Sequence, residues 1–379
     1  MRKVTTIVLG AVLVAAVPSP GRAATAGEAG SASTDTEARW SLATEPAQLP
    51  SWRFTPTATT NRLVIADVVS RSVIWAVGGG ETPGVKDGSV VRSVDGGRSW
   101  QDVTPPGGDA EVFRDVEAFD RDHAVVLAID PPSQIYRTVD GGVTWAVVFE
   151  DPSSGAFYDC MAFFDDREGL AMSDPVDGRF RIARTGDGGR TWRVVPNNGM
   201  PVALDNEFGL ATGTCLQAVG KRDAWFGTAT PAGIKNRVFR TRDRGRTWTE
   251  AVTPLPGGEN FGIRSLSFGD RHHGIAVGGD PPTGTDVGLV AVTSDGGRSW
   301  SLAGSLTGWR NGLTWVPGRR HTAVAVGITG SDVSTDGGQT WRRFDGRSLL
   351  GVDCLPQVAC WAVGAGGLAA RLSMAGHQL

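Results

Sequence analysis

The sequence predicts an all-β fold, a seven-bladed β-propeller, from three observations. An eight-residue pattern, Ser/Thr-x-Asp-x-Gly-x-Ser/Thr-Trp, occurs six times, at 93–100, 138–145, 185–192, 241–248, 293–300 and 334–341. Successive pattern aspartates are 41 to 56 residues apart, which suits one four-stranded blade per copy. Short segments rich in Val, Ile and aromatic residues alternate with Gly, Pro and Asp turns, and no segment shows sustained helical periodicity.

The N-terminal 37 residues precede the predicted propeller. Residues 1–26 predict a secretory signal peptide, with a basic start, an apolar run too short to span a bilayer, and a cleavage site near Ala24 or Ala26. Residues 27–37 are small and polar, which predicts a disordered lead-in. We therefore expect a secreted, extracytoplasmic protein without a membrane span. Its charge after cleavage, 34 basic against 40 acidic residues, disfavours nucleic-acid binding.

Each copy of the pattern lies between the third and fourth predicted strands of a blade. In the second unit the first three strands are FRDVEAF, HAVVLAI and IYRTVD. After the sixth copy, residues 349–372 supply three more strands without a pattern, and residues 39–57 supply a strand near the start. Joining the two ends in a seventh blade removes the exposed sheet edges. The predicted propeller covers 38–374 and leaves a tail, 375–379.

The repeated pattern has a structural explanation. Its aspartate is short enough to accept hydrogen bonds from backbone N–H groups of its own turn, its glycine suits a positive φ, and its tryptophan packs between sheets. One carboxylate per turn offers too few ligands for calcium, so we expect no metal there and no cofactor. The six structural aspartates are Asp95, Asp140, Asp187, Asp243, Asp295 and Asp336.

Four cysteines are available for disulfides in an exported protein. Cys354 and Cys360 are six residues apart across a predicted hairpin, which suits a local bridge. Cys160 and Cys215 fall at matching places in neighbouring repeats, which suits a bridge between two blades. Free buried thiols are the alternative for both pairs.

The pattern resembles the Asp-box, or BNR repeat, of sialidases, sortilin-type ectodomains, xyloglucanases and photosystem II assembly/stability factors. The phrases VIWAVGGGETPG (73–84) and CWAVGAGG (360–367) are most similar to the assembly-factor group and its bacterial relatives. The resemblance implies a propeller and a scaffolding or chaperone-like role, while one fold hosts many chemistries. Some such relatives bear a generic oxidoreductase label, but the sequence has no helix-opening GxGxxG, no CxxC and no CxxCH motif.

The loops opposite the repeated pattern carry acids next to prolines. Asp130, Asp174 and Asp280 each precede a proline between the second and third strands of their blades, and Glu81 occupies the matching place in blade 1. Proline restricts the loop and thereby the direction of the acid. These acids are interpreted either as solvated turns or as an acidic rim that binds a cationic group or a basic segment of a partner.

The starts of the innermost strands carry a second polar set. We expect Asp67, Asp115, Asp159 and Asp353 to be in register around the channel. Four further candidates lie at or beside this level: Arg114, Tyr158, Arg264 and Arg310. These groups either pair and tie blades together or form a polar channel mouth that binds a ligand.

The polar residues at the starts of the innermost strands could also form a sialidase-like active site. In this interpretation arginines bind a carboxylate of the substrate, Tyr158 is the nucleophile and an aspartate is the acid. No Phe/Tyr-Arg-Ile-Pro motif precedes the first pattern, and the histidines recur in separate turns, which fits neither zinc nor a triad. The sequence therefore favours a non-catalytic, monomeric propeller that binds a protein or peptide, with a glycan as a further possible ligand. The alternative is a carbohydrate-active enzyme, which fits better than an oxidoreductase.

Overall fold

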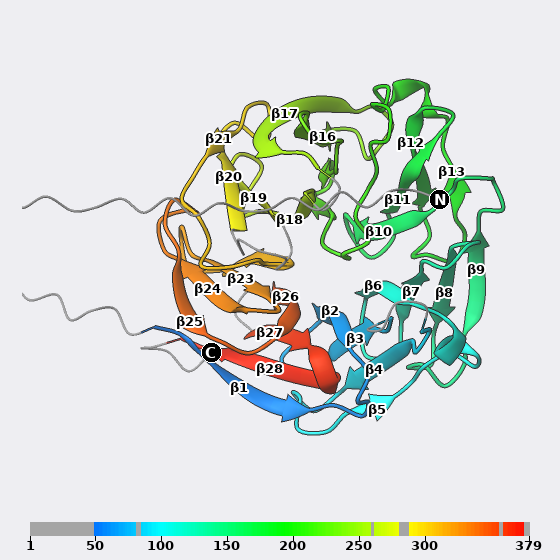
Figure 1. Ribbon diagram of the computed structural model, residues 1–379. Coiled ribbons are helices and arrows are strands. Elements are labelled where there is room, and N and C mark those ends of the chain that lie inside the picture. The colour runs from blue at the N-terminus through cyan, green and yellow to red at the C-terminus, as the bar shows by residue number, and fades with distance from the viewer. Residues whose placement is uncertain (1–48, 81–84, 259–260, 280–287, 356–358, 375–379) are drawn as a thin grey trace, which may run out of the picture. The chain divides into compact units, whose positions relative to one another are not determined.

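The computed structural model describes residues 49–80, 85–258, 261–279, 288–355 and 359–374 (Figure 1). The predicted signal peptide, lead-in and tail lie outside these residues, as do Glu81 and Asp280. The described chain forms seven four-stranded sheets and three short 3-10 helices, η1 (Gly108–Ala110), η2 (Asn197–Gly199) and η3 (Ala365–Gly367). Among these residues, no helix has the length and apolar character needed to cross a membrane.

Each sheet is one blade, and its first strand lies innermost. These strands contact their neighbours in turn around a central cavity, which they line. In chain order from blade 1 to blade 7, the inner strands are β2 (Leu63–Val68), β6 (Phe113–Ala118), β10 (Tyr158–Phe163), β14 (Leu216–Val219), β18 (Ile263–Phe268), β22 (Gly312–Trp315) and β26 (Leu349–Leu355).

The other three strands of each blade follow outward in antiparallel order. The second strands are β3 (Ile74–Gly78), β7 (Ala124–Ala128), β11 (Gly169–Val176), β15 (Asp223–Gly227), β19 (Gly274–Gly279), β23 (Ala323–Gly327) and β27 (Ala359–Gly364). The third strands are β4 (Ser89–Ser93), β8 (Gln134–Thr138), β12 (Arg179–Thr185), β16 (Lys235–Thr241), β20 (Gly288–Thr293), β24 (Gly330–Ser334) and β28 (Leu368–Ser373). The outer strands are β5 (Gln101–Asp102), β9 (Ala146–Glu150), β13 (Arg193–Val194), β17 (Thr249–Pro256), β21 (Ser301–Leu302), β25 (Arg342–Asp345) and β1 (Ser51–Pro56).

The seventh blade combines both ends of the propeller, as predicted. Strand β1 pairs antiparallel with β28, from Ser51 opposite Ser373 to Pro56 opposite Leu368 (Figure 1). The core is divided among the junctions between blades, with one cluster of buried apolar side chains at each of them. Closing the seventh blade therefore completes the ring of packed junctions as well as the hydrogen bonding of the sheet edge.

The six Asp-boxes form the turns that the sequence predicts. In the first box, Asp95 accepts hydrogen bonds from the N–H groups of Arg98 and Ser99 at 3.0 Å and from the Ser99 hydroxyl at 2.6 Å. These bonds hold the pKa of Asp95 near 2, led by the one from the Ser99 hydroxyl. The glycine at the fifth position of the pattern has a positive φ in every box, 79° at Gly97 for example. Each box tryptophan directly precedes an outer strand.

The boxes and the turns between first and second strands share one face of the propeller. Box glycines donate backbone hydrogen bonds to those turns, as Gly96 does to the Ser72 carbonyl and Gly141 to the Asp122 carbonyl. We call this side the box face. The opposite side, which carries the connections into the first strand and between second and third strands, is the loop face.

Both predicted disulfides are present. Cys160–Cys215 joins the start of β10 to the residue before β14, so it links blades 3 and 4, with Cα atoms 6.2 Å apart. Cys354–Cys360 joins β26 to β27 within blade 7. The described residues contain no free cysteine.

Candidate functional site

The carboxylates of the inner strands occupy two levels of the channel, and the predicted register holds for Asp67 and Asp353 but is wrong for Asp115 and Asp159. Asp67 and Asp353 lie opposite Trp75 and Trp361 of their second strands, and Glu117, which the sequence reading missed, occupies the same level in blade 2. Asp115 lies two residues earlier in its strand. Asp159 falls at a register shift between Tyr158 and Cys160, and it does not line the central cavity.

Three of these carboxylates tie neighbouring blades together. Asp353 accepts a hydrogen bond from the backbone N–H of Val68 at 2.9 Å, and Asp67 accepts one from Ala118 at 2.5 Å. Asp115 accepts one from Met161 at 2.6 Å. Each bond runs from the inner strand of one blade to that of the next, so these acids link blades through the backbone rather than by pairing with arginines.

The channel raises the pKa of its acids. Burial is the first cause for each, and the neighbouring carboxylate Asp353 adds to it at Asp67, whose pKa rises to about 8. The pKa values of Asp115, Glu117 and Asp353 are also raised, with burial first. With a pKa of about 8, Asp67 is mostly protonated at neutral pH. The described residues contain no cluster of His, Cys, Asp or Glu suited to a metal ion.

The segment before β14 crosses the channel on the loop-face side. Gly213 lies against Ile65 of blade 1 and the Arg114 carbonyl of blade 2, while the Thr214 carbonyl accepts the N–H of Leu266 in blade 5. Gly213 and Thr214 form one end of the cavity of about 250 Å³ that contains the channel acids. We call residues 209–214 the plug.

The plug rests on a pair of carboxyl groups, Asp159 and Asp174. Gly209 donates its N–H to Asp174 at 2.6 Å, and a side chain at Gly209 would collide with the Asp159 carboxylate. Burial raises the pKa of Asp174 to about 6 and that of Asp159 further above its usual range, with Asp174 the second cause at Asp159. The expectation of Asp174 in a rim loop is wrong, because Asp174 lies within β11 and its carboxylate faces inward.

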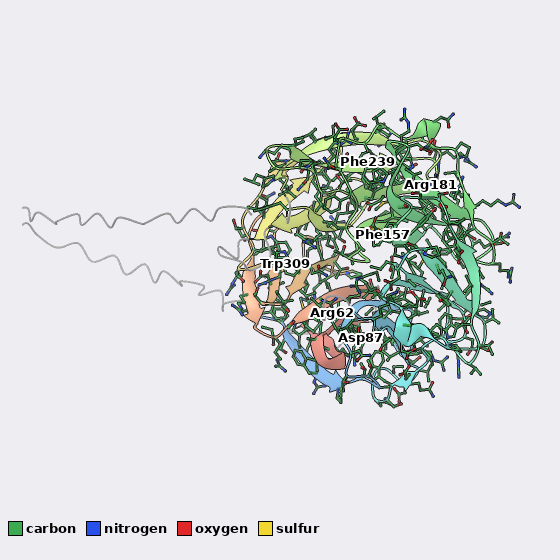
Figure 2. The ribbon with its side chains drawn as sticks, turned by 45° about the vertical axis from the view of Figure 1, so that its right-hand side comes forward. Arg62, Asp87, Phe157, Arg181, Phe239 and Trp309 are labelled. Atoms are coloured by element: carbon green, nitrogen blue, oxygen red, sulfur yellow. A yellow bond between two sulfur atoms is a disulfide. The ribbon has the colours of Figure 1, made fainter. Side chains whose placement is uncertain are left out.

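Arginines occupy the loop-face side of the plug. Arg62 donates to the Gly80 carbonyl at 2.7 Å and Arg114 to the Gly79 carbonyl at 2.9 Å, so two guanidinium groups converge on one turn. Burial, followed by the charge of Arg62, lowers the pKa of Arg114 to about 10. Figure 2 shows Arg62 beside Asp87, whose carboxylate accepts the Gly80 N–H.

The other mouth candidates lie apart from this pair. Arg264 packs its guanidinium over the Trp309 ring, 5.4 Å from the centroid. Arg310 is fully buried in an ion pair with Asp332 at 3.0 Å, and it also donates to the Thr329 hydroxyl at 2.8 Å. The structure therefore does not assemble Arg114, Arg264 and Arg310 into the three-arginine clamp that a sialidase-like site requires.

Tyr158 is also an interior group. Its side chain is fully buried, and its hydroxyl donates to Asp151 at 3.1 Å. Asp151 in turn forms an ion pair with Arg181 at 3.0 Å. Burial, then the charge of Asp151, raises the pKa of Tyr158, which opposes its activation as a nucleophile. The Tyr158–Asp151–Arg181 chain instead anchors the loop above it.

That loop forms one wall of an open groove on the loop face. The groove has a volume of about 580 Å³ and runs between the Asp130-Pro131-Pro132 loop of blade 2 and residues 151–157 of blade 3. Its lining is mainly apolar, and Phe157 (Figure 2) forms part of it. Asp130 stands next to it and pairs with Lys86 at 3.5 Å. We call this depression the Phe157 groove.

Backbone anchoring fixes both walls of the Phe157 groove. The Tyr158 N–H donates to the Ser133 hydroxyl at 3.0 Å, which joins the two loops. The Phe157 N–H donates to Ser173 at 3.0 Å, and Asp151 accepts the Ser153 N–H at 3.0 Å. The sequence analysis located one wall of the groove, the loop of Asp130 and its prolines, but it missed Asp151 and Phe157 in the other wall.

The histidines serve the turns in which they lie, on the box face. His123 contacts the Asp120 carboxylate at 2.9 Å, and His273 contacts Asp270 at 2.8 Å, each three residues along the chain. His321 has a positive φ of 64°. Equivalent pairs in separate blades support the interpretation of a turn role.

Comparisons with known proteins agree with this architecture. The model of the BNR/Asp-box repeat matches residues 332–343. The chain is 31% identical over 113 residues to the photosystem II assembly lipoprotein Ycf48 of Synechococcus sp. (strain CC9902). That match covers 29% of this chain and 29% of the relative, so it spans less than a third of the relative's length.

Solved structures share the fold across most of the chain. YCF48 bound to a D1 peptide has a TM-score of 0.58 at 17% identity, covering 86% of this chain and 98% of that one. YCF48 from Cyanidioschyzon merolae has a TM-score of 0.57 at 18% identity, covering 84% and 98%. The GH74 enzyme of Niastella koreensis has a TM-score of 0.53 at 14% identity, covering 80% and 50%. The chain is an Asp-box β-propeller that resembles photosystem II assembly factors.

Proposed function

We propose that this propeller is an extracytoplasmic, assembly-factor-like protein that binds a peptide segment of a partner protein in the Phe157 groove. The groove is the observation that carries the proposal, because it combines an exposed apolar lining with walls anchored before any ligand arrives. Preorganised walls reduce the conformational entropy lost on binding. A solved structure of similar fold, YCF48, is bound to a D1 peptide, which supports a peptide as ligand.

The composition of the groove favours an extended peptide with an apolar side chain at its centre. Pro131 and Pro132 form one side, Ala156 and Phe157 the other, and the Asp151 carboxylate beneath them is already engaged by Tyr158 and Arg181. Asp130 at the rim, shared with Lys86, suits a basic residue of the same peptide. Proline and aromatic side chains of this kind form recurrent surfaces for extended peptides.

The extracytoplasmic location rests on two features. The described residues hold their four cysteines in two disulfides, which persist in oxidising compartments. The predicted signal peptide at residues 1–26 adds a route of export. Together they support a partner outside the cytoplasm, among exported proteins or the external segments of membrane proteins.

Selection from a displayed library of random twelve-residue peptides tests the proposal. A selected peptide, synthesised with a fluorescent label, would be titrated with the protein and followed by fluorescence polarisation. We expect Phe157→Ala to weaken binding about tenfold or more, as truncation of a central aromatic contact does at other interfaces. Asp130→Asn should produce a smaller loss, greatest for peptides that carry a basic residue.

The control variant is Arg298→Gln, which changes an exposed side chain on the box face. It should leave peptide affinity unchanged. The proposal is wrong if selected peptides bind the Phe157→Ala protein as tightly as the native one, or if Arg298→Gln is the variant that removes binding.

A further inference from the structure

A second hollow lies on the box face, between blades 4 and 5. It has a volume of about 440 Å³ and is lined by Arg240, Arg242, Thr247, Thr249, Glu250, Gly297 and Arg298. Arg240 belongs to β16, and Thr249 is its pairing partner at the start of β17. Gly297 and Arg298 belong to the Asp-box of blade 5. We call this depression the Arg240 hollow.

Arg240 is buried in this hollow without enough hydrogen-bond acceptors. Its side chain is 5% exposed, and its guanidinium lies over the Trp225 ring, 5.5 Å from the centroid. Its Nε and Nη2 atoms make no hydrogen bond within the described part of the chain, and the carboxylate of Asp223 stands 3.7 Å from Nη2. A buried guanidinium with unmatched N–H groups is unfavourable, so the hollow calls for an external acceptor.

Arg92, the equivalent arginine of blade 1, has hydrogen-bond acceptors that Arg240 lacks. Arg92 pairs with Trp75 and Gln101 in the same register in which Arg240 pairs with Trp225 and Thr249. Arg92 also lies over its tryptophan, at 5.3 Å.

Nε lacks a hydrogen-bond partner in both arginines, and the two differ in the acceptors of their terminal nitrogens. Arg92 donates to the Gln101 side chain at 2.8 Å and to the Arg121 carbonyl at 2.5 Å. In blade 4 the shorter Thr249 takes the place of glutamine, and its hydroxyl donates to the Arg240 carbonyl.

Positive charge surrounds the unmatched group. Three arginines and one glutamate line the hollow, and the glutamate, Glu250, also pairs with Arg237 at 3.6 Å. The buried Asp223 carboxylate lies 3.7 Å from Arg240 and 3.8 Å from Arg242, and it is shared with Arg271 at 3.2 Å, so one carboxylate serves three arginines. The Asp243 and Asp295 carboxylates of the adjoining boxes are engaged in their own turns. Burial lowers the pKa of Arg240, followed by the charge of Arg242, and a bound anion would offset the repulsion from Arg242.

We propose that the Arg240 hollow binds a phosphate-type oxyanion, with Arg240, Arg242 and Arg298 as donors. Guanidinium groups match phosphate oxygens in bidentate geometry, and a phosphate monoester carries a charge of about −1.5 to −2, which is opposite in sign to the three arginines. The volume of about 440 Å³ exceeds what one inorganic phosphate fills, so the hollow suits a phosphate monoester with a small organic group. This site is on the opposite face from the Phe157 groove and does not depend on peptide binding.

Calorimetric titration of the full chain tests the site with two probes, inorganic phosphate and glycerol phosphate, in buffers matched in ionic strength with sodium chloride. We expect saturable binding of both, with the monoester binding at least as tightly as inorganic phosphate. Thr249→Gln would supply the acceptor that blade 1 has and should weaken phosphate binding about tenfold or more, because a charged hydrogen bond is then already satisfied. Arg298→Gln should weaken it by a similar factor.

Arg98→Gln is the matched control, because Arg98 occupies the Arg298 position in the Asp-box of blade 1. It should bind phosphate as the native protein does. Thr249, Arg298 and Arg98 are all exposed, so circular dichroism should show the native fold in each variant. The proposal is overturned if the native protein does not distinguish phosphate from chloride at equal ionic strength, or if Thr249→Gln binds phosphate with native affinity.

Discussion

Gly213 should be the least replaceable residue of the plug. Its φ is +72°, and a Cβ atom there would stand 2.4 Å from the Arg114 carbonyl oxygen and 2.1 Å from Cγ1 of Ile65. The left-handed backbone costs a non-glycine residue about 1–2 kcal/mol. Overpacking against a fixed carbonyl and a core side chain adds about 1–3 kcal/mol. We therefore expect Gly213→Ala to lower the free energy of unfolding by about 2–5 kcal/mol.

Gly220 provides a matched control for this substitution. Its φ is +61°, and nothing lies within 4 Å of a Cβ atom placed there. Gly220→Ala should therefore show the backbone cost alone, and the effect of either alanine on the unfolded chain is the same. Urea unfolding followed by tryptophan fluorescence would give both values. Equal losses in the two variants would refute the close packing of the plug against blades 1 and 2.

Two further predictions concern stability. Replacing both cysteines of Cys160–Cys215 by serine should lower the free energy of unfolding by about 4 kcal/mol, because this disulfide closes a loop with a sequence separation of 55. The same replacement at Cys354–Cys360, with a separation of 6, should lower it by about 2 kcal/mol. Urea unfolding of the two double variants would measure both losses. The pKa of Asp67 is about 8 in the folded protein, which is above its value in the unfolded chain. At a pH between these two pKa values the folded state binds more protons than the unfolded state. The free energy of unfolding should therefore fall as the pH rises from about 4 through 8. Asp67→Asn should make the free energy of unfolding less dependent on pH over this range. The same pH dependence in the variant and the native protein would contradict the prediction.

The repeated pattern made the architecture predictable because its chemistry is local. Asp95 and its equivalents bind N–H groups three and four residues ahead, so eight residues are enough to specify the turn. The pairing of β1 with β28 followed from counting strands against boxes. The Cys160–Cys215 bridge followed from equivalent places in neighbouring repeats, which a propeller brings side by side.

The candidate site was less predictable because register and side-chain direction are set by contacts between blades. Both β6 and β10 have a bulge near their start, but Asp159 lies in the bulge of β10 whereas Asp115 directly follows the bulge of β6, so the two aspartates are one position out of line. Arg310 resembled a mouth residue until its partner, Asp332 on β24, was known. The spacing of 56 residues between Asp187 and Asp243 did mark an insertion, but its course across the channel depends on contacts with blades 1, 2 and 5.

The plug separates the charges that the sequence seemed to bring together. On its loop-face side lie Arg62 and Arg114, and on its other side lie Asp67, Glu117 and Asp353. The guanidinium groups therefore lie nearer the loop face than the channel acids, of which Asp67 and Asp353 accept hydrogen bonds from neighbouring blades. This division assigns the polar residues of the inner strands to two separate groups, the arginines near the loop face and the acids within the channel.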